Sequence, residues 1–299
     1  MFRRAALLLV TLAAFTGAGA APASAADTSA PGPFVVAYTD ASVTLNGRSF
    51  TTRYYYPGTS TAQNAPVAAG EFPAIAFGHG FFQAISKYTS TVKHLASWGF
   101  IVGLPNTQTG LSVNHGTFAD EMNASLSYLV AQDAVSTSRF YQHVRQDKLG
   151  LSGHSMGGGA SVLAASRNPA VTAVANLAAA ETTPSAVTAA ATLSKPMMLV
   201  AGDRDTIAGI SGNQRPIYNS KLAPKQLRTI RGGFHCGFID STGLFCDSGS
   251  ITRAVQLQIT RRLLTDWFRY YLAGDTASYD LTWGTPAQTD PQVIFEGVA

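Results

Sequence analysis

Charged residues are scarce in this sequence: they make up 13% of its 299 residues, against 46% hydrophobic residues. This composition excludes a disordered acidic or basic tail, a coiled coil and a collagen-like repeat, and the length allows a sizeable core. The formal net charge of +4 falls to +2 without Arg3 and Arg4, with 19 basic against 17 acidic residues. No Lys/Arg cluster is interleaved with aromatic residues, so nothing points to nucleic acid as a partner.

Long hydrophobic runs are also absent, except near the N-terminus. Met1–Arg4 is positively charged, Ala5–Phe15 is apolar, and Ala23–Ala25 has the small-residue pattern of a cleavage site. A membrane anchor would need about 20 apolar residues, whereas this run breaks at Thr16. We therefore interpret residues 1–25 as a signal peptide and expect a secreted, extracellular protein without stable membrane insertion.

Cysteine is a third scarce residue type, present only as Cys236 and Cys246. Two cysteines without a second ligand pair do not make a metal site, so no metal is expected. In the oxidising environment of an exported protein, two cysteines this close are expected to form a disulfide bond. On the chain-entropy model, so short a loop stabilises the fold by about 2–3 kcal/mol.

The sequence has instead a regular alternation of short apolar runs and amphipathic segments. Residues 26–33 are rich in Pro, Ser and Ala and are interpreted as a linker, followed by one domain over 34–299. Strands are expected at 34–38, 49–56, 74–77, 100–104, 149–151, 171–177, 197–201 and 227–230, and helices at 88–98, 118–129, 156–166 and 255–267. Strands that alternate with helices predict an α/β fold, a mostly parallel sheet with helices on both faces.

One motif stands between an expected strand and an expected helix: Gly153-His154-Ser155-Met156-Gly157, which matches G-x-S-x-G. Only small residues fit beside the serine in so sharp a strand-to-helix turn, which explains the two glycines. The turn exposes the hydroxyl above the sheet and directs backbone N–H groups to the same point. Ser155 is therefore the predicted nucleophile, the alternative being a plain glycine-rich junction.

A serine hydroxyl needs a base to take its proton, and in the α/β-hydrolase order that base is a later histidine. His235 is the only histidine after Ser155, and it lies in a loop after the last expected strand. The alternative is an ordinary surface-loop histidine. His235 is therefore the predicted general base.

The acid that orients the base should follow the strand expected at 197–201. Asp203 and Asp205 both stand there, and their spacing does not separate them. One of the two is expected to form a turn with its own backbone. Asp240 and Asp247 come after the histidine and do not fit the order of the acid.

An oxyanion hole needs two backbone N–H groups. One is expected from Met156, which follows the nucleophile, and the other from the loop Gly78–Phe82 after the first central strand. Glycines at positions 78 and 80 suit a backbone that must turn an N–H group inward. The alternative is a plain turn at a strand end.

Four motifs, taken in order, indicate a family: Gly-His-Ser-Met-Gly-Gly-Gly at 153–159, Gly-Asp-Arg-Asp-Thr-Ile-Ala at 202–208, Pro-Ile-Tyr-Asn at 216–219 and Gly-Gly-Phe-His at 232–235. Over roughly residues 51–272 the chain resembles the actinobacterial cutinases, secreted α/β hydrolases that include poly(ethylene terephthalate) hydrolases and grade into dienelactone-hydrolase and chlorophyllase-like families. The resemblance implies an α/β-hydrolase fold. It also implies that Asp205 is the acid, that Asp203 is structural, and that Phe81 supplies the second oxyanion N–H beside Met156.

The sequence departs from those cutinases at three places. Where they have a Thr-Pro-Trp-His-like segment whose Trp lines the substrate cleft, this chain has Ala178–Thr182, without an aromatic residue. His79 replaces a proline, and the Cys236–Cys246 pair follows the histidine directly, unlike the C-terminal disulfide of the cutinases. We therefore expect ester hydrolysis, with aromatic polyester a poor substrate.

The sequence thus predicts a secreted serine hydrolase that cleaves small or polymeric carboxylic esters through Ser155, His235 and Asp205. No cofactor is expected, and we expect a monomer. Two alternatives stay open because fold and triad do not name the substrate. One is an amidase, peptidase or acyltransferase with the same triad, and the other is an inactive binding protein with a hydrolase fold.

Overall fold

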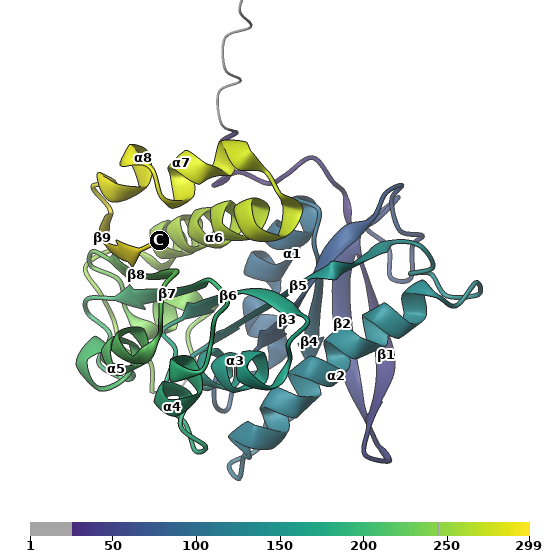
Figure 1. The fold of residues 1–299 in the computed structure, drawn as a ribbon, viewed down its shortest axis with the longest axis horizontal. Helices are drawn as coiled ribbons and strands as arrows, with labels where there is room; N and C mark the ends of the chain where they lie inside the picture. Colours follow the sequence, from purple (N-terminus) through teal and green to yellow (C-terminus); the bar gives the residue numbers. More distant parts are fainter. Residues whose placement is uncertain (1–25, 244) are drawn as a thin grey trace, which may run out of the picture.

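A nine-stranded sheet forms the centre of the computed structural model, which describes residues 26–243 and 245–299. Its strand order is β1-β2-β4-β3-β5-β6-β7-β8-β9 (Figure 1). The strands are β1 Val36–Leu45, β2 Arg48–Pro57, β3 Phe72–Gly78, β4 Ile101–Pro105, β5 Val144–His154, β6 Val171–Leu177, β7 Met197–Gly202, β8 Lys225–Ile230 and β9 Val293–Val298. The helices are α1 Thr89–Ser97, α2 His115–Asp133, α3 Met156–Arg167, α4 Ala186–Ala191, α5 Gln214–Ser220, α6 Arg253–Phe268, α7 Tyr279–Thr282 and α8 Thr285–Gln288.

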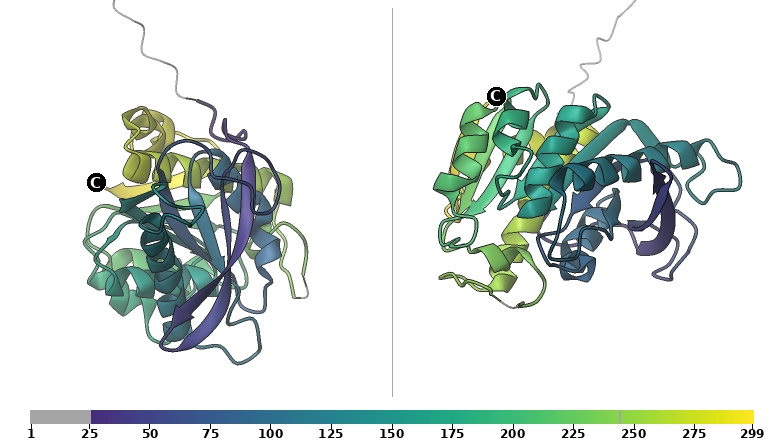
Figure 2. Two further views of the ribbon diagram at one scale, coloured as in Figure 1. Left: turned by 90° about the vertical axis from the view of Figure 1, so that its right-hand side faces the viewer. Right: turned by 90° about the horizontal axis from the view of Figure 1, so that it is seen from below.

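The middle of the sheet is parallel, as the sequence predicts. Strands β4, β3, β5, β6, β7 and β8 pair in parallel, while β1, β2 and β9 join antiparallel at the two edges. The hairpin of β1 and β2 lies at one edge and faces the viewer in the left view of Figure 2. Every residue of β3, β4 and β7 is buried, because parallel strands covered by helices on both faces have no solvent side.

Two hydrophobic clusters cover the two faces of this sheet. Helices α2, α3, α4 and α5 contribute to one cluster, and α1 and α6 to the other. The predicted stripes point inward: Phe118 and Met122 of α2 are fully buried, and Ile259 and Leu263 of α6 are almost so. Apolar residues that recur every three or four positions fall on one helix face, which is why the sequence predicts these two helices.

The elements that the sequence analysis missed are short or lie at an edge. Strand β9 pairs antiparallel with β8 and closes the sheet at the C-terminal edge. Helices α4, α5, α7 and α8 have four to seven residues each, too few for a repeating apolar stripe. Residues 144–148 also extend the strand expected at 149–151, but residues 145–148 are half-buried or exposed, and the strand is continuously buried only from Leu149 to His154.

The segment 26–33 is bonded to the domain along its length. The Thr28 hydroxyl donates to Asp266 Oδ1 at 2.5 Å, and the Gly32 N–H donates to Ser97 Oγ at 2.8 Å. Burial raises the pKa of Asp266 to about 7. The expected signal peptide, 1–25, lies outside the described residues. Within 26–243 and 245–299, no helix has the length and apolar character required to cross a bilayer.

Candidate active site

Ser155 occupies the turn between β5 and α3. Its backbone has φ 55° and ψ −118°, a strained conformation for a residue with a side chain. A Cβ on Gly157 would lie 2.1 Å from the carbonyl oxygen of Gly78, and a Cβ on Gly153 would lie 2.4 Å from the carbonyl oxygen of Gly157. The two flanking glycines are therefore required by close backbone contact, as the motif predicts.

His235 and Asp205 approach each other from two different loops. His235 follows β8, Asp205 follows β7, and His235 Nδ1 lies 2.7 Å from Asp205 Oδ2. The two side chains are 6% and 1% exposed, so the pair is shielded from water. Since a carboxylate only accepts, Nδ1 carries a proton, and a neutral imidazole then has its free lone pair on Nε2.

Asp205 also forms a turn with its own backbone. From the sequence, either Asp203 or Asp205 is expected to form such a turn. Asp205 Oδ1 accepts hydrogen bonds from the backbone N–H groups of Ile207 at 2.9 Å and Ala208 at 2.7 Å. One oxygen thus forms the local turn and the other holds the imidazole. Asp203 accepts instead from the N–H of Gly232 at 2.7 Å and ties the two loops together at their base.

Ser155 and His235 line the same apolar cavity, of about 260 Å³. Large hydrophobic side chains stand exposed around it: Phe81, Phe82, Leu111, Ile207 and Phe245. Phe245 is 94% exposed and belongs to the segment closed by the Cys236–Cys246 disulfide bond. Gly80, Gln83, His154, Cys236 and Ile239 complete the lining.

The loop Gly78–Phe82 packs directly against the turn that carries Ser155. A Cβ on Gly78 would lie 2.8 Å from Gly157 Cα, so the two backbones touch. Phe81 lines the cavity from this loop, and Met156 begins α3 on the other side of Ser155. Both predicted oxyanion donors therefore belong to backbone segments that border the same cavity.

Two buried histidines accompany these segments. His79 places Nδ1 2.8 Å from the Gly80 carbonyl oxygen and Nε2 2.6 Å from the Thr107 carbonyl oxygen. Burial lowers the pKa of His79, while these two carbonyl groups oppose that shift. His154 packs its ring 4.6 Å from that of His235, and burial together with His235 lowers the pKa of His154 well below the ordinary value. His154 is therefore neutral at neutral pH.

Asp247 is a site residue that sequence reasoning missed. Its Oδ2 accepts from the N–H groups of Thr206 at 3.2 Å and His235 at 2.9 Å, and its Oδ1 accepts from the N–H of Cys236 at 2.9 Å. The order of residues in the chain excludes Asp247 as the acid, because it follows His235, and predicts no other role for it. One signal in the sequence could have indicated its role: Asp247 directly follows Cys246, and the disulfide bond to Cys236 brings this part of the chain close to His235.

The segment Ala178–Thr182 does not line the cavity among the described residues. It packs behind the serine turn, where a Cβ on Gly159 would lie 2.2 Å from the Ala180 carbonyl oxygen. Glu181 Oε2 accepts from the N–H of Val187 at 3.0 Å. The aromatic side chains at the cavity come instead from the Gly78–Phe82 loop and the disulfide-closed segment.

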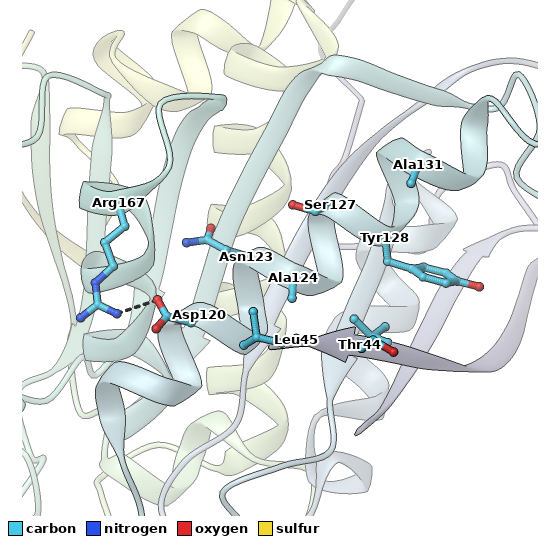
Figure 3. Close-up of a pocket in the computed structure, with 10 residues that line it drawn as sticks. Thr44, Leu45, Asp120, Asn123, Ala124, Ser127, Tyr128, Ala131 and Arg167 are labelled. Atoms are coloured by element: carbon cyan, nitrogen blue, oxygen red, sulfur yellow. Dashed lines mark hydrogen bonds and ion pairs between the residues drawn. The ribbon is translucent and has the colours of Figure 1, made fainter. Parts of the chain in front are cut away.

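A second, larger hollow lies elsewhere, between α2 and the end of β1 (Figure 3). It measures about 530 Å³, and an ion pair of 2.7 Å joins Asp120 and Arg167 at one side of it. Its lining includes Tyr128 and Ser127 but no histidine. Ser155 and His235 line the apolar cavity and are not part of the lining of this larger hollow. No group of three or more His, Cys, Asp or Glu suited to a metal occurs in the described part of the chain.

Comparison with known proteins agrees with this geometry. The profile of the PETase family, described as PET hydrolase-like, matches residues 13–283. A bis(hydroxyethyl) terephthalate hydrolase of Streptomyces coelicolor is 30% identical over 203 residues, 67% of this chain and 59% of that protein. Cutinase est1 of Thermobifida alba is 32% identical over 150 residues, 50% of this chain and 48% of that protein. The matches thus span between about half and three fifths of these relatives, and the resemblance to cutinases is confirmed. With its parallel sheet and this match over most of its length, the chain belongs to the PET hydrolase-like family of α/β hydrolases.

Proposed function

We propose that this protein is a serine hydrolase that cleaves carboxylic esters, with Ser155 as nucleophile, His235 as base and Asp205 as orienting acid. The observation that carries the proposal is that Ser155, in a strained turn, and His235, which is hydrogen-bonded to Asp205, line one apolar cavity. The family and its relatives, named as cutinases and a terephthalate ester hydrolase, support the same reaction class.

The reaction proceeds through an acyl-enzyme. His235 Nε2 takes the proton of Ser155 Oγ as this oxygen bonds to the ester carbonyl carbon. The N–H groups of Phe81 and Met156 donate to the resulting oxyanion, which then collapses and expels the alcohol with the proton from His235. In the second half of the reaction, water attacks the acyl group while His235 Nε2 takes a proton from it. The second oxyanion then collapses, Ser155 Oγ leaves with the proton from His235, and the carboxylic acid is released. Asp205 stays ionised and stabilises the imidazolium.

The cavity mouth favours an ester with apolar groups on at least one side. Phe81 is 47% exposed, Ile207 49% and Leu111 78%, so apolar surface surrounds the serine. A substrate that covers these side chains gains about 25 cal/mol for each Å² removed from water. A charged substrate would gain nothing comparable there.

A fluorophosphonate probe and a panel of soluble esters test the proposal. Wild type should be labelled at Ser155, and Ser155→Ala and His235→Ala should each lose turnover by up to about 10⁶-fold with unchanged circular dichroism. The double variant should be hardly worse, because triad members act as a unit. Near-wild-type turnover by Ser155→Ala, or an unlabelled wild type, would contradict the proposal, the latter favouring an inactive binding protein.

Matched substrates distinguish the remaining alternatives. An ester and an amide of identical acyl group should differ strongly, with the ester much faster. Preference for the amide, or transfer of the acyl group to an added alcohol in place of water, would instead identify an amidase, a peptidase or an acyltransferase. Export belongs to the same proposal: expression with residues 1–25 should yield extracellular, monomeric protein whose N-terminal sequence begins near Ala26.

A further inference from the structure

Gly80 is bonded by side chains at both of its peptide groups. Its N–H donates to the Tyr88 hydroxyl at 2.8 Å, and its carbonyl oxygen lies 2.8 Å from His79 Nδ1. Both side chains are fully buried. The carbonyl also accepts from the N–H of Gln83 at 3.1 Å. The residue before Phe81 is thus held on its N–H side and on its carbonyl side.

The Tyr88 hydroxyl links this loop to the serine turn. Because the hydroxyl oxygen accepts from Gly80, its own proton is free to go to His154 Nδ1, 2.9 Å away. His154 can accept this proton since it is neutral, as its lowered pKa indicates. His154 directly precedes Ser155, so one hydroxyl fixes the oxyanion loop relative to the nucleophile.

The carbonyl side of Gly80 controls the direction of the Phe81 N–H. The carbonyl of Gly80 and the N–H of Phe81 belong to one peptide group, which is planar and trans, so the two point in opposite directions. A side chain that fixes the carbonyl therefore fixes the N–H. In the tautomer with its proton on Nδ1, His79 donates to that carbonyl oxygen, 2.8 Å away.

A glycine at this position needs such external bonds. A Cβ on Gly80 would lie 3.0 Å from the Tyr88 hydroxyl oxygen and 3.1 Å from His154 Nδ1, so a larger residue would displace them. Glycine, however, has the greatest backbone freedom of all residues. Close packing favours the glycine, and hydrogen bonds to the N–H and the carbonyl of Gly80 remove the freedom that comes with it.

We propose that Tyr88 and His79 are positioning residues that hold Gly80 from both sides and thereby aim the Phe81 N–H at the oxyanion. The proposal rests on the proposed function and adds to it two residues that do not line the cavity. Oxyanion donors act only if they are fixed in advance, and loss of one donor typically lowers kcat by about 10²–10³-fold.

Tyr88→Phe removes one oxygen atom and tests the N–H side. We expect kcat to fall by about 10- to 100-fold, a fraction of the loss of a whole donor, with KM changed less than about twofold. Affinity for a trifluoromethyl ketone, which forms a tetrahedral anion on the serine, should fall by the same factor as kcat/KM. The matched control is Tyr54→Phe, whose equally buried hydroxyl donates to the Ser125 carbonyl at 2.9 Å away from the cavity. Equal losses of kcat in both variants would show a merely structural role and overturn the proposal.

Two substitutions of His79 test the carbonyl side. The amide nitrogen of asparagine reaches the position of histidine Nδ1, while that of glutamine reaches the position of Nε2. His79→Asn should therefore keep a donor on the Gly80 carbonyl and retain more turnover than His79→Gln, whose amide reaches only the Thr107 carbonyl. The opposite order would overturn the role of His79.

These experiments separate this proposal from the proposed function. If wild type has Ser155-dependent turnover and Tyr88→Phe retains full kcat and inhibitor affinity, only the positioning role is overturned. If wild type has no Ser155-dependent turnover, the proposed function fails and this proposal fails with it. Selective loss in Tyr88→Phe, with Tyr54→Phe unchanged, supports both.

Discussion

The proposed active site consists of two halves that rely on different interactions to different degrees. The nucleophile half, residues 78–82 and 153–159, relies on glycine backbones in direct contact, such as Gly157 against Gly78. The base half, residues 202–208 and 232–247, relies on carboxylates and a disulfide bond. In the base half, Asp203, Asp205 and Asp247 accept bonds from the backbone N–H groups of Thr206, Ile207, Ala208, Gly232, His235 and Cys236.

The difference reflects the task of each half. The nucleophile half must hold one strained backbone conformation. Direct packing does this because close-packed backbone segments leave no space into which either could move. The base half must join two loops that are distant in the chain and keep an imidazole at hydrogen-bonding distance from an acid. Charge-assisted hydrogen bonds do this, in addition to the close contact of Gly202 with Gly233, where a Cβ on Gly202 would lie 2.4 Å from the Gly233 carbonyl carbon. Added atoms should therefore damage the first half, and loss of charge the second.

The largest effect is expected from loss of the orienting charge in the base half. Asp205→Asn should lower kcat by 10² or more and up to about 10⁴-fold, because the imidazole loses the partner that selects its tautomer. Asp203→Asn should act mainly on stability, since Asp203 accepts from the backbone N–H of Gly232 and makes an ion pair of 3.9 Å with the exposed Arg204, whereas Asp205 bonds His235. Steady-state kinetics of both variants measure this, and the reverse order of activities would assign the acid to Asp203.

Addition of a single carbon to the nucleophile half should be the next largest effect. Gly157→Ala would place Cβ 2.1 Å from the Gly78 carbonyl oxygen and 2.6 Å from that of His79. We expect a loss of about 3 kcal/mol in the free energy of unfolding, at the upper end for overpacking. Gly212→Ala is the control, because, apart from its neighbours in the chain, no atom of residues 26–243 or 245–299 lies within 4 Å of its Cβ. Equal midpoints of urea unfolding for Gly157→Ala and Gly212→Ala would refute the idea that backbone contact holds the nucleophile half.

Reduction of the Cys236–Cys246 bond should weaken the base half without altering its charges. The bond closes a short loop that begins beside His235, and its loss should cost about 2–3 kcal/mol of stability and lower turnover, since small displacements of a base matter. Thermal melts and turnover with and without reductant measure this, with a double Cys→Ser variant as the control that reductant should not affect. Two free thiols in the unfolded, unreduced protein would disprove the bond.

Asp247 offers a smaller and more selective perturbation of the same half. Asp247→Asn removes the charge that joins Thr206 to His235, and we expect kcat to fall by roughly tenfold through misplacement of the base. Asp240→Asn is matched, because Asp240 also bonds a backbone N–H, that of Ser90 at 2.8 Å, away from the acid loop. A similar loss of kcat in Asp247→Asn and Asp240→Asn would show that turnover depends on the acidic charge of residues 240–247 in general and not on the position of Asp247.

Both halves contribute side chains to the cavity mouth, so the rates on different ester substrates depend on both. Because no aromatic side chain from the Ala178–Thr182 segment reaches the cavity, the rate on aromatic polyester should be roughly tenfold lower than that of a cutinase with the Trp, at 1.4 kcal/mol for each decade. The measure is aromatic acid released from film, scaled to turnover on a short-chain aryl ester and compared with a cutinase that has the Trp. Equal scaled rates would show that Phe81, Phe82 and Phe245 replace the ring.

The sequence alone determined the parts of this protein that depend on neighbouring residues. The serine turn is visible because Gly153 and Gly157 are needed within two positions of Ser155. The parallel core is visible because buried strands are continuous apolar runs, and helices α2 and α6 because their stripes repeat over several turns. His235 follows from being the only histidine after the serine.

Only the tertiary structure decided what depends on segments that are distant in the chain. From the residues alone Asp203 and Asp205 are equivalent, because the choice depends on which carboxylate faces a loop 30 residues later. Asp247, the Tyr88 hydroxyl and the edge strand β9 leave no local pattern either, since each acts on a partner from another element. Hydrogen bonds and close contacts between such elements are set by the assembled core, so their geometry is absent from any short stretch of sequence.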